Sequence, residues 1–429
     1  MPLDPARPAC HLLGLQTGVK ALSDFDETIG KARPVSVSAF GFYGSWTDFM
    51  KIAVPNLLLT IVTLGVYRFW ATTRERQYLW SQTQFIDERL EWTGTGMELF
   101  IGFIMVFFLI GIPFAIIQLV AQGAIFQGAP VVAGVLTLVM FMILFYLTGV
   151  AYFRAMRYRL SRTYWRGIRG GSDDPGLHYG LSYVWKHTVA TIPLFLLYPW
   201  ASISLWNERW NAMSFGPYRF EANAQWTKLM KRYLLFYLAP FLLFLAGIYA
   251  AVQEQRGGLG AGGIAAMGGF VVLIIIAIYI VMPLAALLYY SKFIRVGVGG
   301  LRIGELEFEF KARSPDWILF FLTNWLIWGI AIGLAFVPIS IVMGGSGFSP
   351  ETFGENMSAA VIGTLALSAV IGVIAVGLAN ALIRYRSWKF FVTHMEAYGE
   401  VNLDRMSQSE TVVSGHGEGL LDAFDVGAI

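Results

Sequence analysis

The chain has 429 residues, of which 56% are hydrophobic and only 14% are charged. Soluble domains usually carry about 25% charged residues, so this composition, with its apolar runs of about 20 residues, excludes an ordinary soluble protein. The net charge of +3 is too small to suggest nucleic-acid binding. The single cysteine, Cys10, excludes an internal disulfide framework and a metal site built from cysteines. Composition therefore predicts a helical protein that crosses a membrane several times.

Residues 1–35 hold scattered acidic residues and no basic start followed by an apolar run, so they do not predict a secretory signal. We expect a mobile N-terminal segment here, with the first membrane segment near residue 52 acting as the insertion signal. Residues 36–405 are expected to form the integral membrane domain. Residues 406–429 begin with a linker-like composition and end in a short amphipathic stretch, so we expect a mobile C-terminal tail.

Six apolar stretches are each long enough to cross about 30 Å of hydrocarbon at a rise of about 1.5 Å per residue. They cover residues 98–120, 130–153, 230–252, 268–290, 317–343 and 359–383. The links inside these three pairs, 121–129, 253–267 and 344–358, contain one basic residue among them, Arg256. The other connections are rich in Lys and Arg. Because basic loops stay in the cytoplasm, we predict six long transmembrane helices as three hairpins, with both chain ends cytoplasmic.

Two further apolar segments, 52–69 and 188–205, are shorter and have basic residues on both sides. If each crossed the membrane once, the basic loop 207–232 would have to lie outside. If neither crosses, every basic loop lies inside. We therefore predict two short re-entrant or interfacial helices that enter and leave on the cytoplasmic side and pack against the long spans. Eight ordinary spans are the alternative.

The two short segments also match each other at an offset of about 130 residues. The matched pairs include Trp70 and Trp200, Trp80 and Trp210, Arg89 and Arg219, and Glu91 and Glu221. Two of these matches are tryptophan, a rare residue, and no gap is needed. We interpret the match as an internal repeat that relates residues 36–129 to residues 160–265, with these eight side chains in structural roles.

Short runs of alternating apolar and polar residues recur outside the apolar segments. They include 40–44, 89–94, 164–169, 218–221 and 306–310. Period-two alternation rich in aromatic and β-branched residues is typical of strands, and isolated strands are not stable. We expect small β-hairpin elements on the cytoplasmic side, with irregular loops as the alternative.

Three sets of side chains are candidates for function. The first is a juxtamembrane basic cluster that could bind anionic lipid headgroups or form an interface: Arg154, Arg157, Arg159, Arg162 and Arg166. Its alternative role is to set the topology, beside an aromatic belt. The second is Asn56, Thr60 and Thr63, which would line a cavity if their segment is re-entrant. The third is the group of eight repeat residues. We predict no catalytic, cofactor-binding or metal-binding residue, and no cofactor.

Four stretches of the sequence resemble the YjgN-like family of bacterial inner-membrane proteins, whose function is not established. They are Leu64–Ala71 with Tyr78–Trp80, Glu91–Gly94 with Glu98–Phe100, Arg162–Arg169, and Gly417–Asp425. The second repeat departs from the pattern. Tyr198-Pro199-Trp200 stands where the pattern has a Leu-Gly-aromatic sequence. The resemblance implies a multi-pass location in the inner membrane. It implies no catalytic or ligand residues.

Three function classes remain. The cores of the six long stretches contain no Asp, Glu, Lys, Arg or His, which argues against ion-coupled transport. We find no catalytic motif, so we expect no enzyme. The preferred hypothesis is a non-enzymatic scaffold or regulator of membrane partners or lipids. The alternative is a transporter or channel for a neutral or lipid-like solute. The expected partners are membrane lipids and a membrane protein or a second copy of the chain, and not nucleic acid.

Overall fold

The computed structural model describes residues 39–255, 279, 281–345, 359–399 and 407–411. The chain divides into two units, Met1–Ala39 and Phe40–Ile429, and every element below belongs to the second. The predicted mobile segment 1–35 lies outside the described residues. So do most of two predicted links and residues 412–429 of the predicted tail.

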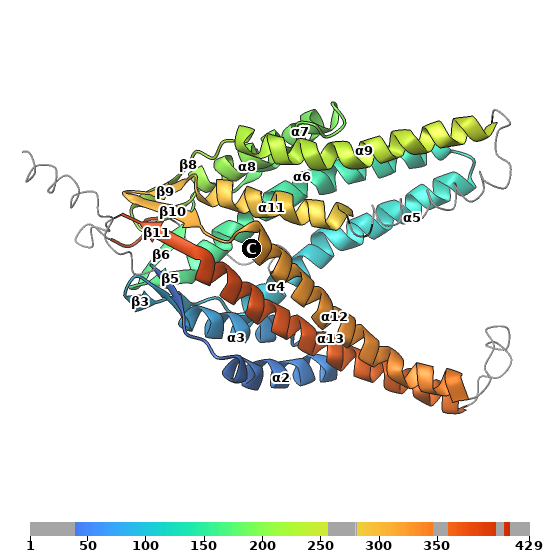
Figure 1. Cartoon of the computed structure of the whole chain (residues 1–429), viewed down its shortest axis with the longest axis horizontal. Helices are drawn as coiled ribbons and strands as arrows, with labels where there is room; N and C mark the ends of the chain where they lie inside the picture. The colour runs from blue at the N-terminus through green and yellow to red at the C-terminus, as the bar shows by residue number, and fades with distance from the viewer. Residues whose placement is uncertain (1–38, 256–278, 280, 346–358, 400–406, 412–429) are drawn as a thin grey trace, which may run out of the picture. The chain divides into compact units, whose positions relative to one another are not determined.

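Eleven short strands in the described residues form two antiparallel sheets. The first sheet holds Phe40–Phe42 (β1), Thr83–Phe85 (β2) and Glu88–Arg89 (β3). The second holds, in spatial order, Glu91–Trp92 (β4), Thr163–Trp165 (β5), Ile168–Gly171 (β6), Ser214–Phe215 (β7), Tyr218–Ala222 (β8), Leu301–Ile303 (β9), Leu306–Phe310 (β10) and Met395–Tyr398 (β11). Only Leu90 separates β3 from β4, and β11 contacts β1. The strands thus follow one another around a curled arrangement, which we call the strand ring (Figure 1).

Tight hairpins build most of the strand ring. In β5–β6, Trp165 faces Ile168 across the ladder, which leaves Arg166 and Gly167 as a two-residue turn with φ of 51° and 71°. Positive φ at both positions is typical of the type I′ turn, whose twist matches that of the flanking strands. The hairpins β2–β3, β7–β8 and β9–β10 have the same two-residue spacing.

The strands at the predicted alternating runs are confirmed, but the predicted size of the β structure is wrong. In β10, Leu306 and Phe310 are buried whereas Glu307 and Glu309 are exposed, as period-two alternation requires. The hairpins do not stay small and separate, because eight strands join edge to edge. The physical reason is that a lone hairpin leaves two unpaired edges, and each neighbour here satisfies one of them.

Two short helical hairpins connect adjacent strands. The first consists of Trp46–Val62 (α2) and Arg68–Ser81 (α3), and the second of Leu177–Thr191 (α7) and Tyr198–Asn211 (α8). Each hairpin reverses at residues with positive φ, at Leu64 (51°) and Gly65 (93°) in the first and at Leu194 (52°) and Phe195 (66°) in the second. Leu64, Leu194 and Phe195 are exposed. An apolar tip exposed in this way is expected for a segment that dips into lipid.

The long helices also run in pairs. They are Gly96–Val106 (α4), a π-helical turn Phe107–Gly111 (η1), Ile112–Phe126 (α5) and Pro130–Arg162 (α6); Thr227–Gln255 (α9) and Met282–Val298 (α11); and Ser314–Gly345 (α12) and Ala359–His394 (α13). The π-helical turn ends two residues before Pro113, whose ring excludes an ordinary hydrogen-bonding pattern in the turn before it. Thr95 and Glu98 form a capping box at the start of α4, which fixes where this span leaves the strand ring.

Four stretches in the described residues are long and apolar enough to cross a membrane: Gly96–Phe126, Pro130–Arg162, Ser314–Ser340 and Ile362–His394. This finding confirms a polytopic helical membrane protein, but the predicted count of six spans is not reached. The predicted span 230–252 lies within α9, and most of 268–290 lies outside the described residues.

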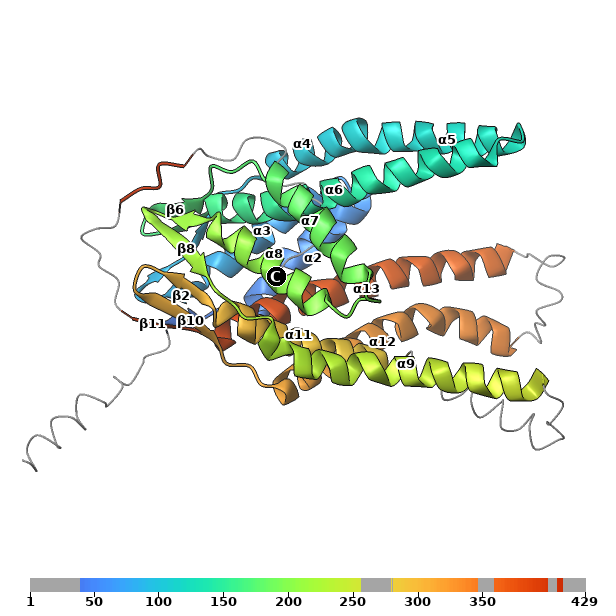
Figure 2. The ribbon, with the colours of Figure 1, turned by 90° about the horizontal axis from the view of Figure 1, so that it is seen from above.

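The order of elements follows a single rule. Every helical pair leaves one strand and returns to the next strand in the ring: α2–α3 joins β1 to β2, α4–α6 joins β4 to β5, and α7–α8 joins β6 to β7. In the same way α9–α11 joins β8 to β9, and α12–α13 joins β10 to β11. Figure 2 shows the strands together at one end of the long helices, and Figure 1 shows α12–α13 leaving that end in a different direction from α5 and α6.

Candidate functional site

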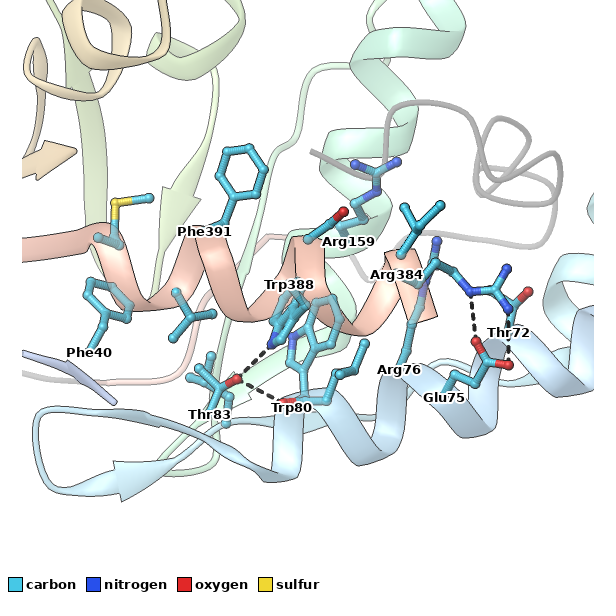
Figure 3. A pocket seen from close by; sticks show the side chains of 16 residues that line it. Phe40, Thr72, Glu75, Arg76, Trp80, Thr83, Arg159, Arg384, Trp388 and Phe391 are labelled. Atoms are coloured by element: carbon cyan, nitrogen blue, oxygen red, sulfur yellow. Dashed lines mark hydrogen bonds and ion pairs between the residues drawn. The ribbon is translucent and has the colours of Figure 1, made fainter. Parts of the chain in front are cut away.

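A cavity of about 410 Å³ lies where α3 and α13 meet the strand ring (Figure 3). Its lining comes from segments far apart in the sequence: Phe40, Thr72, Glu75, Arg76, Leu79, Trp80, Thr83, Leu90, Arg159, Ile383, Arg384, Ser387, Trp388, Phe391, Val392 and Met395. The volume falls within the range of about 300–1,000 Å³ that is typical of small-molecule sites. We take this cavity as the candidate functional site.

Two indole rings fix the centre of the cavity wall. The Trp80 and Trp388 rings stack with centroids 4.0 Å apart and planes inclined by 28°. The Trp388 Nε1–H donates to the Thr83 hydroxyl at 2.9 Å, and the Trp80 Nε1–H donates to the Thr163 hydroxyl at 2.9 Å. Because both indoles are hydrogen-bonded, this wall keeps its shape without a ligand.

An ion pair closes one side of the cavity. The Arg384 guanidinium on α13 contacts both Glu75 carboxylate oxygens on α3, at 2.8 Å from Nε and 3.2 Å from Nη2. The Glu75 side chain is only 6% exposed, whereas that of Arg384 is 38% exposed. The Nη2 contact is a hydrogen bond, and the Nε contact adds a favourable charge interaction at short range. The ion pair therefore fixes α13 to α3 across 309 positions of sequence.

The five arginines of the predicted basic cluster are not equivalent in the structure. Arg159 lines the cavity. Arg154 donates from Nε to the Pro175 carbonyl at 3.1 Å, and Arg157 donates from Nη1 to the Asp174 carbonyl at 3.0 Å. These two bonds hold α6 against the loop that follows β6. Of the five arginines in the predicted cluster, Arg159 lines this cavity.

The other two arginines connect α6 and its hairpin to neighbouring elements. Arg162 pairs with Glu98 at 2.9 Å, and the same carboxylate accepts from the Tyr158 hydroxyl at 3.1 Å. Arg166 pairs with Asp87, which brings the β5–β6 turn to the β2–β3 turn. The role of the cluster in lipid binding stays a prediction, and the contacts show that its members also serve the fold.

The predicted cavity residues of the first short segment lie elsewhere. Asn56 is buried and donates from Nδ2 to the Ala71 carbonyl of α3 at 3.4 Å. Thr60 donates to the Asn56 carbonyl at 2.7 Å, and Thr63 donates to the Leu59 carbonyl at 2.7 Å. Asn56 thus joins the two helices of the first short hairpin. None of the three residues lines the 410 Å³ cavity.

The eight repeat residues differ in how far their side chains are buried. Trp80 is buried, whereas Trp70, Trp200 and Trp210 are half-buried against other aromatic rings. Arg89, Glu91, Arg219 and Glu221 are exposed on the strands β3, β4 and β8. Residues at matched positions therefore occupy the same kind of element. The duplication itself stays a prediction.

A second group of cations was not singled out from the sequence. Lys228 and Arg232 at the start of α9 lie near Lys292 and Arg295 of α11. Burial first, and then the neighbouring cations, lower the pKa of the Lys292 amine below its ordinary value. The signal available from the sequence was the basic character of both loops, but only the fold places them together. Within the described residues, no three His, Cys, Asp or Glu side chains gather as a metal site requires.

The described part of the C-terminal tail lies against the strand ring. Gln408 accepts from the Arg169 backbone N–H at 3.2 Å and donates to the Gly167 carbonyl at 2.9 Å. The Arg169 guanidinium also donates to the Thr411 carbonyl. Residues 407–411 are therefore docked on the β5–β6 hairpin, and the predicted amphipathic end lies outside the described residues.

These elements define a class: a polytopic helical membrane protein whose helical pairs are tied together by a ring of antiparallel hairpins. Residues 37–423 match the family of bacterial proteins of unknown function DUF898, and the chain belongs to this family. The predicted resemblance to the YjgN-like family is confirmed, because curated relatives carry the name inner membrane protein YjgN.

The similarity to those relatives is local. The Escherichia coli K12 protein is 29% identical over 131 residues, which is 30% of this chain and 30% of that protein. The Salmonella typhimurium protein is 32% identical over 89 residues, which is 21% of this chain and 20% of that protein. The matched part thus spans less than a third of the length of these relatives. No solved structure matches the chain.

Proposed function

We propose that this protein is a six-pass protein of the bacterial inner membrane, without enzymatic activity, that scaffolds or regulates membrane lipids or membrane-protein partners. A second copy of the chain is one such partner. The observation that carries the proposal is how little of the long helices is covered by the rest of the protein. In the four candidate spans, only 6%, 11%, 6% and 11% of the most apolar window is buried.

Low burial of this kind favours a protein that presents its helices to lipid or to other proteins. A solute pathway needs several spans packed around a polar interior, and ionisable groups in the membrane usually mark one. Here α12 and α13 pack mainly on each other, and Figure 1 shows them leaving the strand ring in a different direction from α5 and α6. Exposed apolar faces on all pairs remain available for contacts in the membrane.

The strand ring supports the proposed topology. Strands of one sheet must lie on one side of the membrane, so every helical pair between them crosses an even number of times. A helix of 15 residues such as α7 is about 22 Å long, too short for about 30 Å of hydrocarbon. The α2–α3 and α7–α8 pairs are therefore proposed as re-entrant hairpins, related by the internal repeat. The basic residues around the ring favour a cytoplasmic location for it and for both chain ends.

The proposal is tested by photocrosslinking on one helix. A photoreactive phenylalanine analogue at Leu326, which is 63% exposed on α12, should give discrete protein adducts, or adducts with one enriched lipid class. The same analogue at Ala331, which is 4% exposed on α12, is the matched control and should react only within the chain. Proteins and lipids that copurify in mild detergent identify the adducts.

The contradicting outcome is equally specific. If position 326 gives the same intramolecular pattern as position 331, and the copurified lipids match the bulk membrane in composition, the chain recruits nothing. The scaffold proposal is then wrong. Solute flux through vesicles that contain the purified protein would then favour the transporter alternative.

A further inference from the structure

The 410 Å³ cavity combines positive charge with an apolar wall. Three arginines line it, Arg76, Arg159 and Arg384, together with Glu75, whose carboxylate pairs with Arg384. The remaining lining is largely aromatic or aliphatic. A cavity of this composition is complementary to a ligand that is anionic at one end and apolar at the other.

The arginines come from three different helices and converge only in the folded protein. Arg76 lies on α3, Arg159 near the end of α6, and Arg384 on α13 (Figure 3). Arg76 also lies over the Trp92 ring, with its guanidinium carbon 5.2 Å from the centroid. Arginine presents a planar fork of donors that matches phosphate oxygens, and it keeps its charge when it is buried.

The apolar wall is built before any ligand arrives. The stacked rings of Trp80 and Trp388 lie beside the arginines in Figure 3, with Phe391 further along α13. Hydrogen bonds from both indoles to threonine hydroxyls fix the rings. A preformed wall lowers the entropy cost of binding the apolar part of a ligand.

The cavity also lies at a definite depth. Arg159 is three residues before the end of the candidate span Pro130–Arg162, and Arg384 lies ten residues before the end of Ile362–His394. These are the ends at which the spans meet the strand ring. In the proposed topology this is the level of the cytoplasmic headgroups, where basic pockets between membrane helices bind anionic lipids.

We propose that this cavity binds the phosphate headgroup of one anionic membrane lipid, with its glycerol and first methylene groups against the indole wall. The inference rests on the proposed function and names the lipid class for it. A free phosphate ion offers the same charge but no apolar part, so the wall and the depth favour a lipid as the source. The mainly apolar lining also favours a lipid with a small headgroup over a lipid with a large polar headgroup.

The test uses the full chain, purified and stripped of loosely held lipid. Retention of phosphatidylglycerol, phosphatidylethanolamine or inorganic phosphate is followed by native mass spectrometry. The wild type should retain one phosphatidylglycerol. Arg159→Gln should weaken this binding about tenfold, because a charge-assisted hydrogen bond is lost. The control, Arg302→Gln, removes an exposed charge on β9 outside the cavity and should leave retention unchanged. Arg154→Gln tests the outer basic cluster as an alternative site and should weaken retention less than Arg159→Gln.

A second pair of variants leaves every charge in place. Ser387→Trp fills the cavity from its α13 wall and should also weaken phosphatidylglycerol retention about tenfold. Thr393→Trp adds the same ring to an exposed position on the same helix and should have no effect. Size-exclusion profiles that match the wild type show that each variant has folded.

Three results would overturn the inference. The first is equal phosphatidylglycerol retention by the wild type, Arg159→Gln and Ser387→Trp. The second is loss of retention in Arg154→Gln alone, which would place the lipid on the outer basic cluster. The third is displacement of the lipid by inorganic phosphate at equal concentration, which would make the ligand a soluble anion. In each case copurification of other lipids or proteins would leave the proposed function standing.

Discussion

Replacing Arg384 with methionine should lower the free energy of unfolding by about 2–4 kcal/mol. The change leaves the Glu75 carboxylate buried without the guanidinium that contacts both of its oxygens, and breaking one side of a buried pair is strongly destabilising. We expect less than the loss of a fully dry pair, since Arg384 is 38% exposed and solvent screens part of the interaction. The loss is measured by SDS-induced unfolding in mixed micelles, followed by circular dichroism.

Two further variants separate charge from packing. The double variant Glu75→Gln with Arg384→Met should recover at least half of the lost stability, because the Glu75 carboxylate no longer lies buried without Arg384. Arg302→Met breaks the exposed pair of Arg302 with Glu307, whose side chains are 61% and 58% exposed, and should cost less than about 1 kcal/mol. If Arg384→Met is as mild as Arg302→Met, the pair does not hold α13 to α3.

Replacing Trp80 with alanine should destabilise the protein by about 3–5 kcal/mol, the usual cost of deleting a large buried aromatic ring. The Trp80 ring stacks on Trp388 at 4.0 Å and packs against Trp92 at 4.8 Å. Its indole N–H also bonds Thr163. The substitution therefore removes a contact with α13, one with β4 and one with β5. The same unfolding assay measures the loss.

Two other tryptophans provide the comparison. Trp210, the matched position in the repeat, is half-buried, so Trp210→Ala should cost less than Trp80→Ala. Trp185 is 47% exposed on α7, and Trp185→Ala should cost less than about 1 kcal/mol. Equal losses of unfolding free energy at all three positions would mean that the Trp80 stack stabilises the protein no more than an exposed tryptophan does.

The features that sequence reasoning predicts well are those set by local chemistry or by the membrane. Apolar length and the distribution of basic residues predict the long helical pairs, because hydrocarbon thickness and charge translocation are general constraints. The period-two runs predict where strands lie, and three of the hairpin turns carry glycine where φ is positive, at Gly167, Gly216 and Gly304.

The features that escaped prediction depend on contacts between distant segments. The pairing of Glu91 with Tyr164 joins β4 to β5, although the whole α4–α6 pair lies between these strands in the sequence. No local sequence pattern encodes this pairing. The position of the reversal in the first short hairpin has no such local signal either. Pro55 lies inside α2, where a membrane helix tolerates it, whereas the chain reverses at Leu64 and Gly65.

The candidate site shows the same limit. Arg159 was predicted as one member of a basic cluster, yet Arg76 and Arg384 of the cavity were not linked to it. The three residues are separated by 83 and 225 positions of sequence, and only the packing of α3, α6 and α13 brings them together. Charge patterns along a chain predict which membrane face a residue occupies, but not which side chains share a cavity on that face.

The central claim is that the whole strand ring lies on one face of the membrane, so that the two short helical hairpins do not cross it. Single cysteines at Pro217 and Glu305, on two hairpin turns, and at Gln127, at the far end of α5, are compared in a Cys10→Ser background. An impermeant maleimide applied from the periplasmic side should label only position 127, and inverted vesicles should show the reverse. Labelling of position 217 from the periplasm, with position 305 protected, would contradict the account.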